Sequence, residues 1–228
     1  MMRIIKISML ALALLASRAF AGDLEDGLKF FRSSDYDSAA KSFRKAAEQG
    51  VADAQLYLGR MYDDGQGVTQ NYQQAAAWYR KAAEQGHAVA QSRMGIMYDK
   101  GRGVARNEKL AVSWFRKAAA QGYAEGQTLL GFMYERGQGV PLNYPEAVKW
   151  YLKAAEQGFA QAQYNLGLMY NSGLGVPQDP VEAYKWLSIS GAETLIGVLQ
   201  EGWVEKGMTP AQISEAQQRA SDWKKAHQ

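Results

Sequence analysis

The most informative absence in this 228-residue chain is cysteine, which does not occur at all. The fold therefore has no disulfide bond and no thiol chemistry, so its stability must come from packing. A lipid anchor on a cysteine after an export signal is excluded as well. Histidine is nearly as scarce, because His87 and His227 are the only two and lie far apart in the sequence. Neither has a set of ligands nearby, so the sequence predicts no metal site.

Long apolar runs are also missing. The longest, at residues 7–16, has about half of the ~20 residues that a membrane-spanning helix needs. It follows the basic residues Arg3 and Lys6 and precedes a small-x-small motif at residues 19–21, a pattern typical of a secretory signal. We therefore expect a signal peptide at 1–21 with a cut after Ala21, and a periplasmic or secreted protein. A retained membrane anchor is the alternative.

An excess of one charge is absent once the predicted signal is removed. Of the 26 basic residues, Arg3, Lys6 and Arg18 fall in the signal, whereas all 23 acidic residues follow it, which leaves 23 of each sign. The sequence pI of about 8.9 therefore comes from the segment that is expected to be discarded. Neither nucleic acid nor an anionic membrane is predicted as a partner from charge.

What the chain does contain is one pattern, written four times with a period of 36 residues. The pattern carries Gly59 onto Gly95, Gly131 and Gly167, and Trp78 onto Trp114, Trp150 and Trp186. Repeat arrays grow by stacking similar units rather than around one central core. The sequence therefore predicts four units, at 51–86, 87–122, 123–158 and 159–191.

Each unit is predicted to consist of two antiparallel helices. In the first unit, apolar residues at helical spacing predict helix A at about 52–63 and helix B at about 72–85. The two glycines of residues 65–67 predict the exit from helix A, because they permit positive φ angles. Small residues let the helices approach closely, and the aromatic pair Trp78 and Tyr79 is expected to fill the space between units.

The two ends of the array depart from the pattern. Residues 22–50 predict a helix pair that matches the repeat only in its second half and lacks the Gly-x-Gly-Val loop. Residues 192–228 predict a helix at about 193–200 and a last helix with Thr209 as N-cap and Gln212 in the capping-box position. We expect both ends to be caps, because the terminal units of an array have no neighbour on one side.

Two segments of each unit carry a family resemblance. They read Ala-x-Ala-Gln-x-x-Leu-Gly-x-Met-Tyr-x-x-Gly-x-Gly-Val and Ala-x-x-Trp-Tyr-x-Lys-Ala-Ala-x-x-Gly, and they recur over residues 51–191. The pattern resembles the Sel1-like repeat, a relative of the tetratricopeptide repeat. The resemblance implies an all-α fold, a right-handed superhelical solenoid of antiparallel helix pairs. It also implies a protein-interaction scaffold, often in the bacterial envelope or in secreted proteins.

Relatives in this family differ in use. Some exported ones regulate sensor kinases, some assist envelope assembly, and some act in contact with a host. One subgroup has a disulfide in each repeat and has been linked to penicillin binding. This chain has no cysteine, a departure that puts penicillin binding in doubt here.

Motifs that would support catalysis are weak. Ser42 and Lys45 match the Ser-x-x-Lys of penicillin-recognising enzymes, yet no Lys-Thr-Gly accompanies them. Asp63 and Asp64 form an acidic pair for which a solvated helix end is the default interpretation. The Gly-x-Gly turns are not phosphate loops, because no Lys-Ser or Lys-Thr follows them. We predict neither enzyme activity nor a cofactor.

A comparison of the four units with one another locates a candidate site on helix A. The core positions repeat closely, whereas positions 53, 56, 60, 63 and 64 and their copies vary in shape or charge. Their spacing of three or four residues predicts a shared helix face. By resemblance to tetratricopeptide arrays, this face lines a concave groove with an apolar strip and a charged rim, suited to a peptide or a helix. Partial burial by the next unit's helix A is the alternative. The predicted groove residues are Asp53, Leu56, Arg60, Asp64, Ser92, Ile96, Lys100, Thr128, Phe132, Arg136, Tyr164 and Leu168.

Three hypotheses for the function follow. The first is a monomeric, exported scaffold that holds or regulates another envelope protein. The second is an envelope hydrolase of the penicillin-binding or β-lactamase kind, for which the sequence gives no support. The third is a secreted host-contact protein that uses the same groove. The first and third need only export and a groove, so the sequence does not separate them, and it does not identify the partner.

Overall fold

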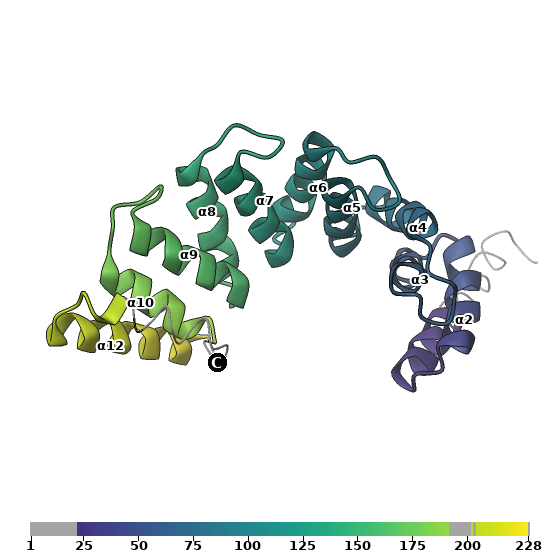
Figure 1. Cartoon of the computed structure of the whole chain (residues 1–228). Helices are drawn as coiled ribbons and strands as arrows, with labels where there is room; N and C mark the ends of the chain where they lie inside the picture. Colours follow the sequence, from purple (N-terminus) through teal and green to yellow (C-terminus); the bar gives the residue numbers. More distant parts are fainter. Residues whose placement is uncertain (1–21, 192–201, 203, 228) are drawn as a thin grey trace, which may run out of the picture. The chain divides into compact units, whose positions relative to one another are not determined.

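The computed structural model describes residues 22–191, 202 and 204–227, and all regular structure in this part of the chain is helical (Figure 1). The prediction of an all-α fold built from consecutive paired helices is confirmed. The predicted signal peptide at 1–21 and the predicted helix at about 193–200 lie outside the described residues. Within the described part, no helix combines the length and apolarity that crossing a membrane requires.

The helices follow the 36-residue period of the sequence. The first helices of the repeats are α3 (Ala52–Asp64), α5 (Ala88–Lys100), α7 (Ala124–Arg136) and α9 (Ala160–Ser172). The second helices, with one copy before the first repeat, are α2 (Tyr36–Glu48), α4 (Tyr72–Glu84), α6 (Glu108–Ala120), α8 (Tyr144–Ala155) and α10 (Pro180–Ile189). A helix at residues 22–32 precedes them, and α12 (Pro210–Ala226) follows.

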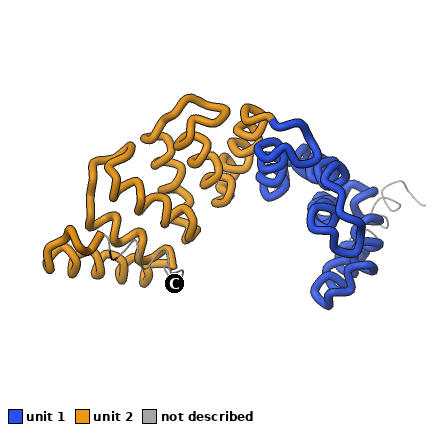
Figure 2. Tube along the Cα trace, viewed as in Figure 1, with its two compact units in different colours: residues 1–106 blue, residues 107–228 orange. Residues whose placement is uncertain are grey.

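The chain divides into two compact units, residues 1–106 and 107–228 (Figure 2). The boundary falls inside the second predicted repeat, after the loop that follows α5. Unit 1 contains α2 to α5, and unit 2 contains α6 to α10 and α12.

Short polar caps fix where the helices begin and end. Asn71 precedes α4, and its Oδ1 accepts a hydrogen bond from the backbone N–H of Gln74 over 3.0 Å. Gly65 follows α3 with φ of 71°, and its N–H donates to the Met61 carbonyl. Such side-chain caps and left-handed glycines satisfy the backbone groups that a helix leaves unpaired at its ends. The helices predicted for the first repeat are therefore confirmed to within one residue at each end.

Gly67, the second glycine of the loop after α3, has a further role. Its φ is 64°, and a Cβ at this position would overlap the carbonyl group of Tyr36, the first residue of α2. The loop thus packs directly on the backbone of the preceding helix pair. Glycine is required there for the close approach as well as for the backbone conformation.

The core of unit 1 lies between helix pairs. Phe43, Leu58 and Met61 are fully buried in it, with the alanines of α2 and α3. Of the aromatic pair in α4, only Tyr79 fills the core, since it is 1% exposed. Trp78 is partly exposed, and Lys81 Nζ lies 4.0 Å from the centre of its ring. The expectation that both aromatic residues fill the space between units is therefore correct for Tyr79 and correct in part for Trp78, which packs partly buried against the core of α2 and α3.

Buried glutamines join each helix A to the helix before it. Gln55 is 4% exposed, and its Nε2 donates to the Ala47 carbonyl at the end of α2 over 3.1 Å. Gln85 Nε2 in turn donates to Gln55 Oε1 over 2.7 Å. The first of these bonds recurs in the later repeats as Gln91 to Ala83, Gln127 to Ala119 and Gln163 to Ala155. Each of these helix-end carbonyls also accepts from the backbone N–H of the glycine three residues later, so the amide adds a second hydrogen bond and pairs the buried glutamine itself.

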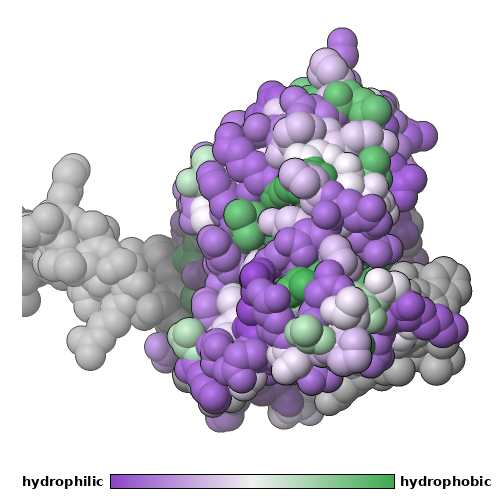
Figure 3. Space-filling view, turned by 90° about the vertical axis from the view of Figure 1, so that its left-hand side faces the viewer, coloured by the Kyte–Doolittle hydropathy of each residue, from purple (hydrophilic) through white to green (hydrophobic). Residues whose placement is uncertain are grey.

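Unit 2 ends with α12, which packs on α10. The predicted capping box is present, because Thr209 Oγ1 accepts from Gln212 N and the Thr209 N–H donates to Gln212 Oε1. Arg219 Nη1 donates to Glu182 Oε1 of α10 over 2.6 Å. Seen from the side of α10 and α12, the surface is mostly hydrophilic with small, separate hydrophobic patches (Figure 3).

Candidate functional site

Helix α3 has an inner and an outer face. The residues that repeat from unit to unit, such as Ala54, Leu58 and Met61, are fully buried. Arg60 and Asp64, which change from unit to unit, are exposed. Because the α-helix repeats every 3.6 residues, the two groups fall on opposite faces. In α3, sequence variation therefore coincides with the surface.

The predicted site residues of unit 1 are divided between exposed and partly buried positions. Arg60 Nε donates to Asp64 Oδ2 over 3.4 Å, and Lys100 Nζ lies 2.8 Å from Asp99 Oδ2. These charged residues thus have partners within their own helices. Because the pairs are exposed to solvent, each contributes little to stability. The exposed members are Asp53, Arg60, Asp64 and Lys100, and the partly buried ones are Leu56 and Ile96.

Two predicted site residues are not at the surface. Ser92 is 0% exposed and Thr128 is 5% exposed. Thr128 Oγ1 donates to the Ala124 carbonyl one turn earlier in α7 over 2.8 Å. Both occupy the position of Leu56 in the first repeat, and that position turns toward the interior in their repeats. Contact of these two side chains with a partner does not fit this burial.

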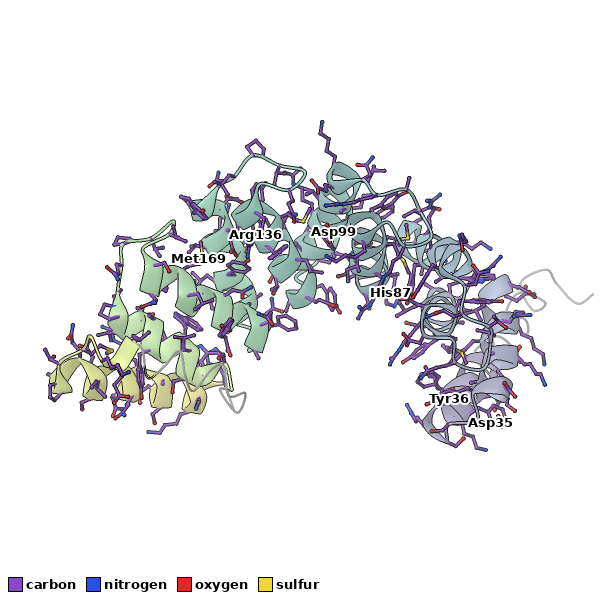
Figure 4. The ribbon with its side chains drawn as sticks, in the orientation of Figure 1. Asp35, Tyr36, His87, Asp99, Arg136 and Met169 are labelled. Atoms are coloured by element: carbon purple, nitrogen blue, oxygen red, sulfur yellow. The ribbon has the colours of Figure 1, made fainter. Side chains whose placement is uncertain are left out.

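The predicted residues of unit 2 contribute to its core. Phe132 packs partly buried against the core of α8 and α9, and the Arg136 guanidinium lies 5.5 Å from its ring centre. Tyr164 and Leu168 of α9 pack against a cluster formed by α10, Val204 and α12. Figure 4 labels Arg136 at the end of α7. Partial burial, the alternative interpretation of the apolar strip, therefore describes these residues, although each keeps some exposure.

A cavity of about 530 Å³ opens on the outer face of α3 in unit 1. Three predicted residues, Leu56, Arg60 and Asp64, line it together with side chains from α4 and α5. The full lining is Leu56, Tyr57, Arg60, Asp63, Asp64, Tyr79, Val89 and Arg93. The structure thus brings these three predicted residues together around one concave site.

Asp63 is the unusual group in this cavity. Its Oδ2 accepts a hydrogen bond of 3.4 Å from the Tyr79 hydroxyl, while its Oδ1 is buried and has no hydrogen-bond partner among the described residues. Desolvation raises the pKa of Asp63, and the neighbouring charge of Asp64 raises it further, against smaller opposing effects of Arg102, Tyr79 and Arg93. The solvated helix end expected for the acidic pair is correct for Asp64 and wrong for Asp63.

Burial also raises the pKa of two tyrosine hydroxyls, one in each unit. Burial, together with the nearby Asp63 carboxylate, raises the pKa of Tyr79 above its ordinary value. In unit 2, Tyr151 donates to Glu135 Oε2 over 2.6 Å, and burial followed by this hydrogen bond raises its pKa as well. Both hydroxyls therefore stay protonated and act as hydrogen-bond donors.

The remaining polar candidates have structural partners. His87 caps α5, because its Nδ1 accepts from the Ala90 N–H over 3.4 Å and its Nε2 lies 3.0 Å from Asp53 Oδ1 (Figure 4). Near Ser42, Lys45 Nζ lies 4.0 Å from Asp23 Oδ1. In the described part of the chain, no group of three histidine, cysteine, aspartate or glutamate residues is placed to hold a metal ion.

Five cavity residues, Tyr57, Asp63, Tyr79, Val89 and Arg93, are absent from the predicted groove residues, although Asp63 and Val89 stand at the variable positions 63 and 53. Positions 53, 57, 60 and 64 are spaced by four, three and four residues, which is the spacing of a single helix stripe. Position 57 reads Tyr57, Arg93, Leu129 and Asn165 across the four repeats. Position 57 both varies between repeats and lies on this helix stripe. These two signals together would have identified position 57, in place of position 56, as part of the site.

Comparison with known proteins adds a family and several similar structures. The family model described as Sel1 repeat matches residues 10–51, 52–87, 88–123, 124–159 and 160–193. The first match overlaps the predicted signal peptide at 1–21 and the predicted N-terminal cap at 22–50, and the last match ends two residues inside the predicted C-terminal cap. The boundaries of both caps stay predictions. A search among curated proteins found no match.

Among solved structures, the chain is similar to a protective antigen present in uropathogenic Escherichia coli strains that displays an SLR fold. The two share 40% identity with a TM-score of 0.77, over 82% of this chain and 40% of the antigen. The chain therefore corresponds to less than half of the antigen's length. A Sel1 repeat protein from Oxalobacter formigenes is 37% identical with a TM-score of 0.70, over 75% of this chain and 68% of that protein.

Proposed function

The chain belongs to the Sel1 repeat family, and we propose that it is an exported scaffold of the bacterial cell envelope that binds a partner protein or peptide. Sel1 repeat proteins are in general protein-interaction scaffolds rather than enzymes. Under this proposal the protein is a monomer, and the outer faces of α3 and α5 in unit 1 are its binding surface. The predicted residues of unit 2 that keep some exposure are proposed as a separate contact surface of that unit.

The observation that carries the proposal is the cavity on α3. Repeated residues of this helix are buried, while the residues that vary surround a concave site of about 530 Å³ with both apolar and charged walls. A concave surface with a few placed polar groups suits a segment of another protein. Scaffold positions and binding positions are thereby separated within one helix.

Export rests on the sequence before residue 22. A basic start, a short apolar run and a small-x-small motif support a cleavable signal. The test is mass spectrometry of the protein recovered from the periplasm and from the medium. A mature N-terminus at Gly22 is expected. Recovery of the mature protein from the periplasm or from the medium distinguishes a periplasmic from a secreted protein. Recovery of the uncleaved chain in membranes would contradict the proposal.

Binding is tested by capturing partners from envelope extracts with wild type and two variants. Val89→Lys places a charge in the cavity, and the same position is Asp53, Glu125 and Gln161 in the other repeats, so the helix is expected to tolerate a polar side chain there. Ala77→Lys changes the charge by the same amount on the exposed part of α4 outside the cavity and serves as control. We expect Val89→Lys to lose the partner and Ala77→Lys to retain it, with unchanged circular dichroism. Equal capture by both variants would refute the assignment of the surface.

A second candidate is a secreted protein that contacts a host through the same surface. The 40% identity to a protective antigen of uropathogenic Escherichia coli favours it. This candidate predicts mature protein in the medium and binding to host extracts rather than to envelope extracts. The same pair of variants tests the surface in either case.

A further inference from the structure

The last turn of helix A carries a carboxylate in three of the four repeats. In only two of the three is the carboxylate paired with a basic residue that follows it directly in the sequence. Asp99 lies 2.8 Å from Lys100 Nζ, and Glu135 lies 3.7 Å from Arg136 Nε. In the first repeat, Asp64 takes the place of that Lys or Arg. Among the described residues, no Lys, Arg or His nitrogen forms an ion pair with Asp63 within 4.0 Å.

Arg60, which also lines the cavity, is already engaged. Arg60 donates to Asp64 Oδ2 at 3.4 Å, so Asp64 rather than Asp63 is neutralised by it. Arg93 also lines the cavity, and Arg102 is close enough to act on Asp63. Both lower the pKa of Asp63, but each does so by less than desolvation or the charge of Asp64 raises it. Asp63 therefore contributes a carboxylate oxygen that is buried and without a hydrogen-bond donor.

A buried acceptor without a donor costs free energy, and native proteins rarely leave one unsatisfied. Here the acceptor belongs to a residue that lines an open cavity, and Leu56 and Val89 provide apolar wall beside it. A long cationic side chain fits this combination, because its alkyl stem covers apolar surface while its head group donates hydrogen bonds to a carboxylate.

Resting on the proposed role of this surface, we propose that the cavity in unit 1 binds a basic side chain, an arginine or lysine of the partner, through Asp63. The cation supplies in the complex what Lys100 and Arg136 supply to the equivalent carboxylates. Leu56 and Val89 contact its stem. The partner segment is thereby specified by chemistry: an exposed peptide or helix with a basic residue at its anchoring position.

The proposal gives Asp63 an effect on binding opposite to its effect on folding. Asn171 occupies the equivalent position in the fourth repeat, so asparagine is compatible with this helix turn. Asp63→Asn removes a desolvated charge and is expected to leave the melting temperature unchanged or raised. Loss of binding without loss of stability would mark Asp63 as a residue retained for recognition.

The experiment follows the Val89 methyl signals by NMR in the purified protein, with EDTA present to remove metal ions. The probes are N-acetyl-arginine amide and N-acetyl-lysine amide, with N-acetyl-citrulline amide as the neutral isostere of the first. We expect a saturable shift with the basic probes and at least about tenfold weaker binding of citrulline, because hydrogen bonds to charged groups are worth more than neutral ones. Asp63→Asn is expected to weaken the basic probes by a similar factor.

Glu135→Gln is the matched control, since it removes the same charge where Arg136 is already the partner. It is expected to leave probe binding unchanged. The proposal is overturned if neither basic probe shifts the signals, if citrulline binds as well as arginine, or if Glu135→Gln weakens binding as much as Asp63→Asn. If Val89→Lys abolishes partner capture while Asp63→Asn does not, the binding surface stands and the basic anchor is refuted.

Discussion

Replacing each glycine of the loop after α3 with alanine separates backbone strain from steric overlap. Gly65 and Gly67 have similar φ angles, 71° and 64°, so an alanine at either position has the same left-handed conformation. That conformation costs an alanine about 1–2 kcal/mol, of which the reduced entropy of the unfolded chain returns ~0.4–1 kcal/mol. Strain alone therefore predicts a net loss of about 1 kcal/mol at both sites.

The surroundings of the two glycines differ. A Cβ on Gly65 would come within 3.2 Å of Gln70 Cβ, a tight contact that a shift of a few tenths of an ångström relieves. A Cβ on Gly67 would overlap the backbone of Tyr36, which is held in the first turn of α2. Overpacking of this kind adds about 1–3 kcal/mol. We expect Gly67→Ala to lose about 3 kcal/mol in total and Gly65→Ala about 1 kcal/mol.

The assay is urea unfolding followed by circular dichroism at equal protein concentration, with the midpoint and the slope compared for the two variants and wild type. A lower midpoint for Gly67→Ala than for Gly65→Ala at similar slopes is expected. Equal midpoints would refute the argument, since they would mean that backbone conformation alone selects glycine at both positions. A changed slope would indicate that one part of the array unfolds separately.

Three further predictions concern other parts of the chain. Gln55→Leu keeps the side-chain volume but removes one donor to the Ala47 carbonyl, which keeps the Gly50 N–H, and the acceptor of Gln85. A loss of about 1 kcal/mol is expected in urea unfolding, and an unchanged midpoint would contradict it. The pKa of Asp63 is raised in the folded state above its ordinary value of 3.8, so the folded protein holds that proton longer and loses stability as pH rises through this interval. The melting temperature of Asp63→Asn relative to wild type should therefore increase from low pH to neutral pH, and parallel profiles would argue against the shift. Thr209→Ala removes the capping box and is expected to cost α12 about 1 kcal/mol, measured as faster amide hydrogen exchange in that helix alone.

The helix pairs could be predicted because their signals are local. The cap Asn71, the glycine Gly65 and the apolar spacing between them each act within one or two turns of the chain, and they recur at every period. Such signals give helix ends to within a residue. The same locality explains the correct assignment of Thr209 as the cap of α12.

The binding face was harder to predict, because variation between repeats has two causes. Leu56, Ser92 and Thr128 differ from one another, yet Ser92 and Thr128 are buried. An inner position can vary when its packing neighbours vary with it, so variation alone does not identify surface. Asp63 was assigned to solvent because its contact with Tyr79 joins residues 16 positions apart, and no local pattern encodes it.

The hydrogen bonds that join neighbouring helix pairs have a consequence for how such a gene can change in length. Gln55 to Ala47 spans 8 residues, Arg44 to Tyr62 spans 18, and Gln85 to Gln55 spans 30. All three sequence separations are shorter than the 36 residues between successive copies. Duplication or loss of one whole copy therefore recreates every one of these bonds at the new junction. Array length can change by recombination in whole copies without any new contact having to arise, whereas an insertion of part of a copy breaks the bonds that span the point of insertion.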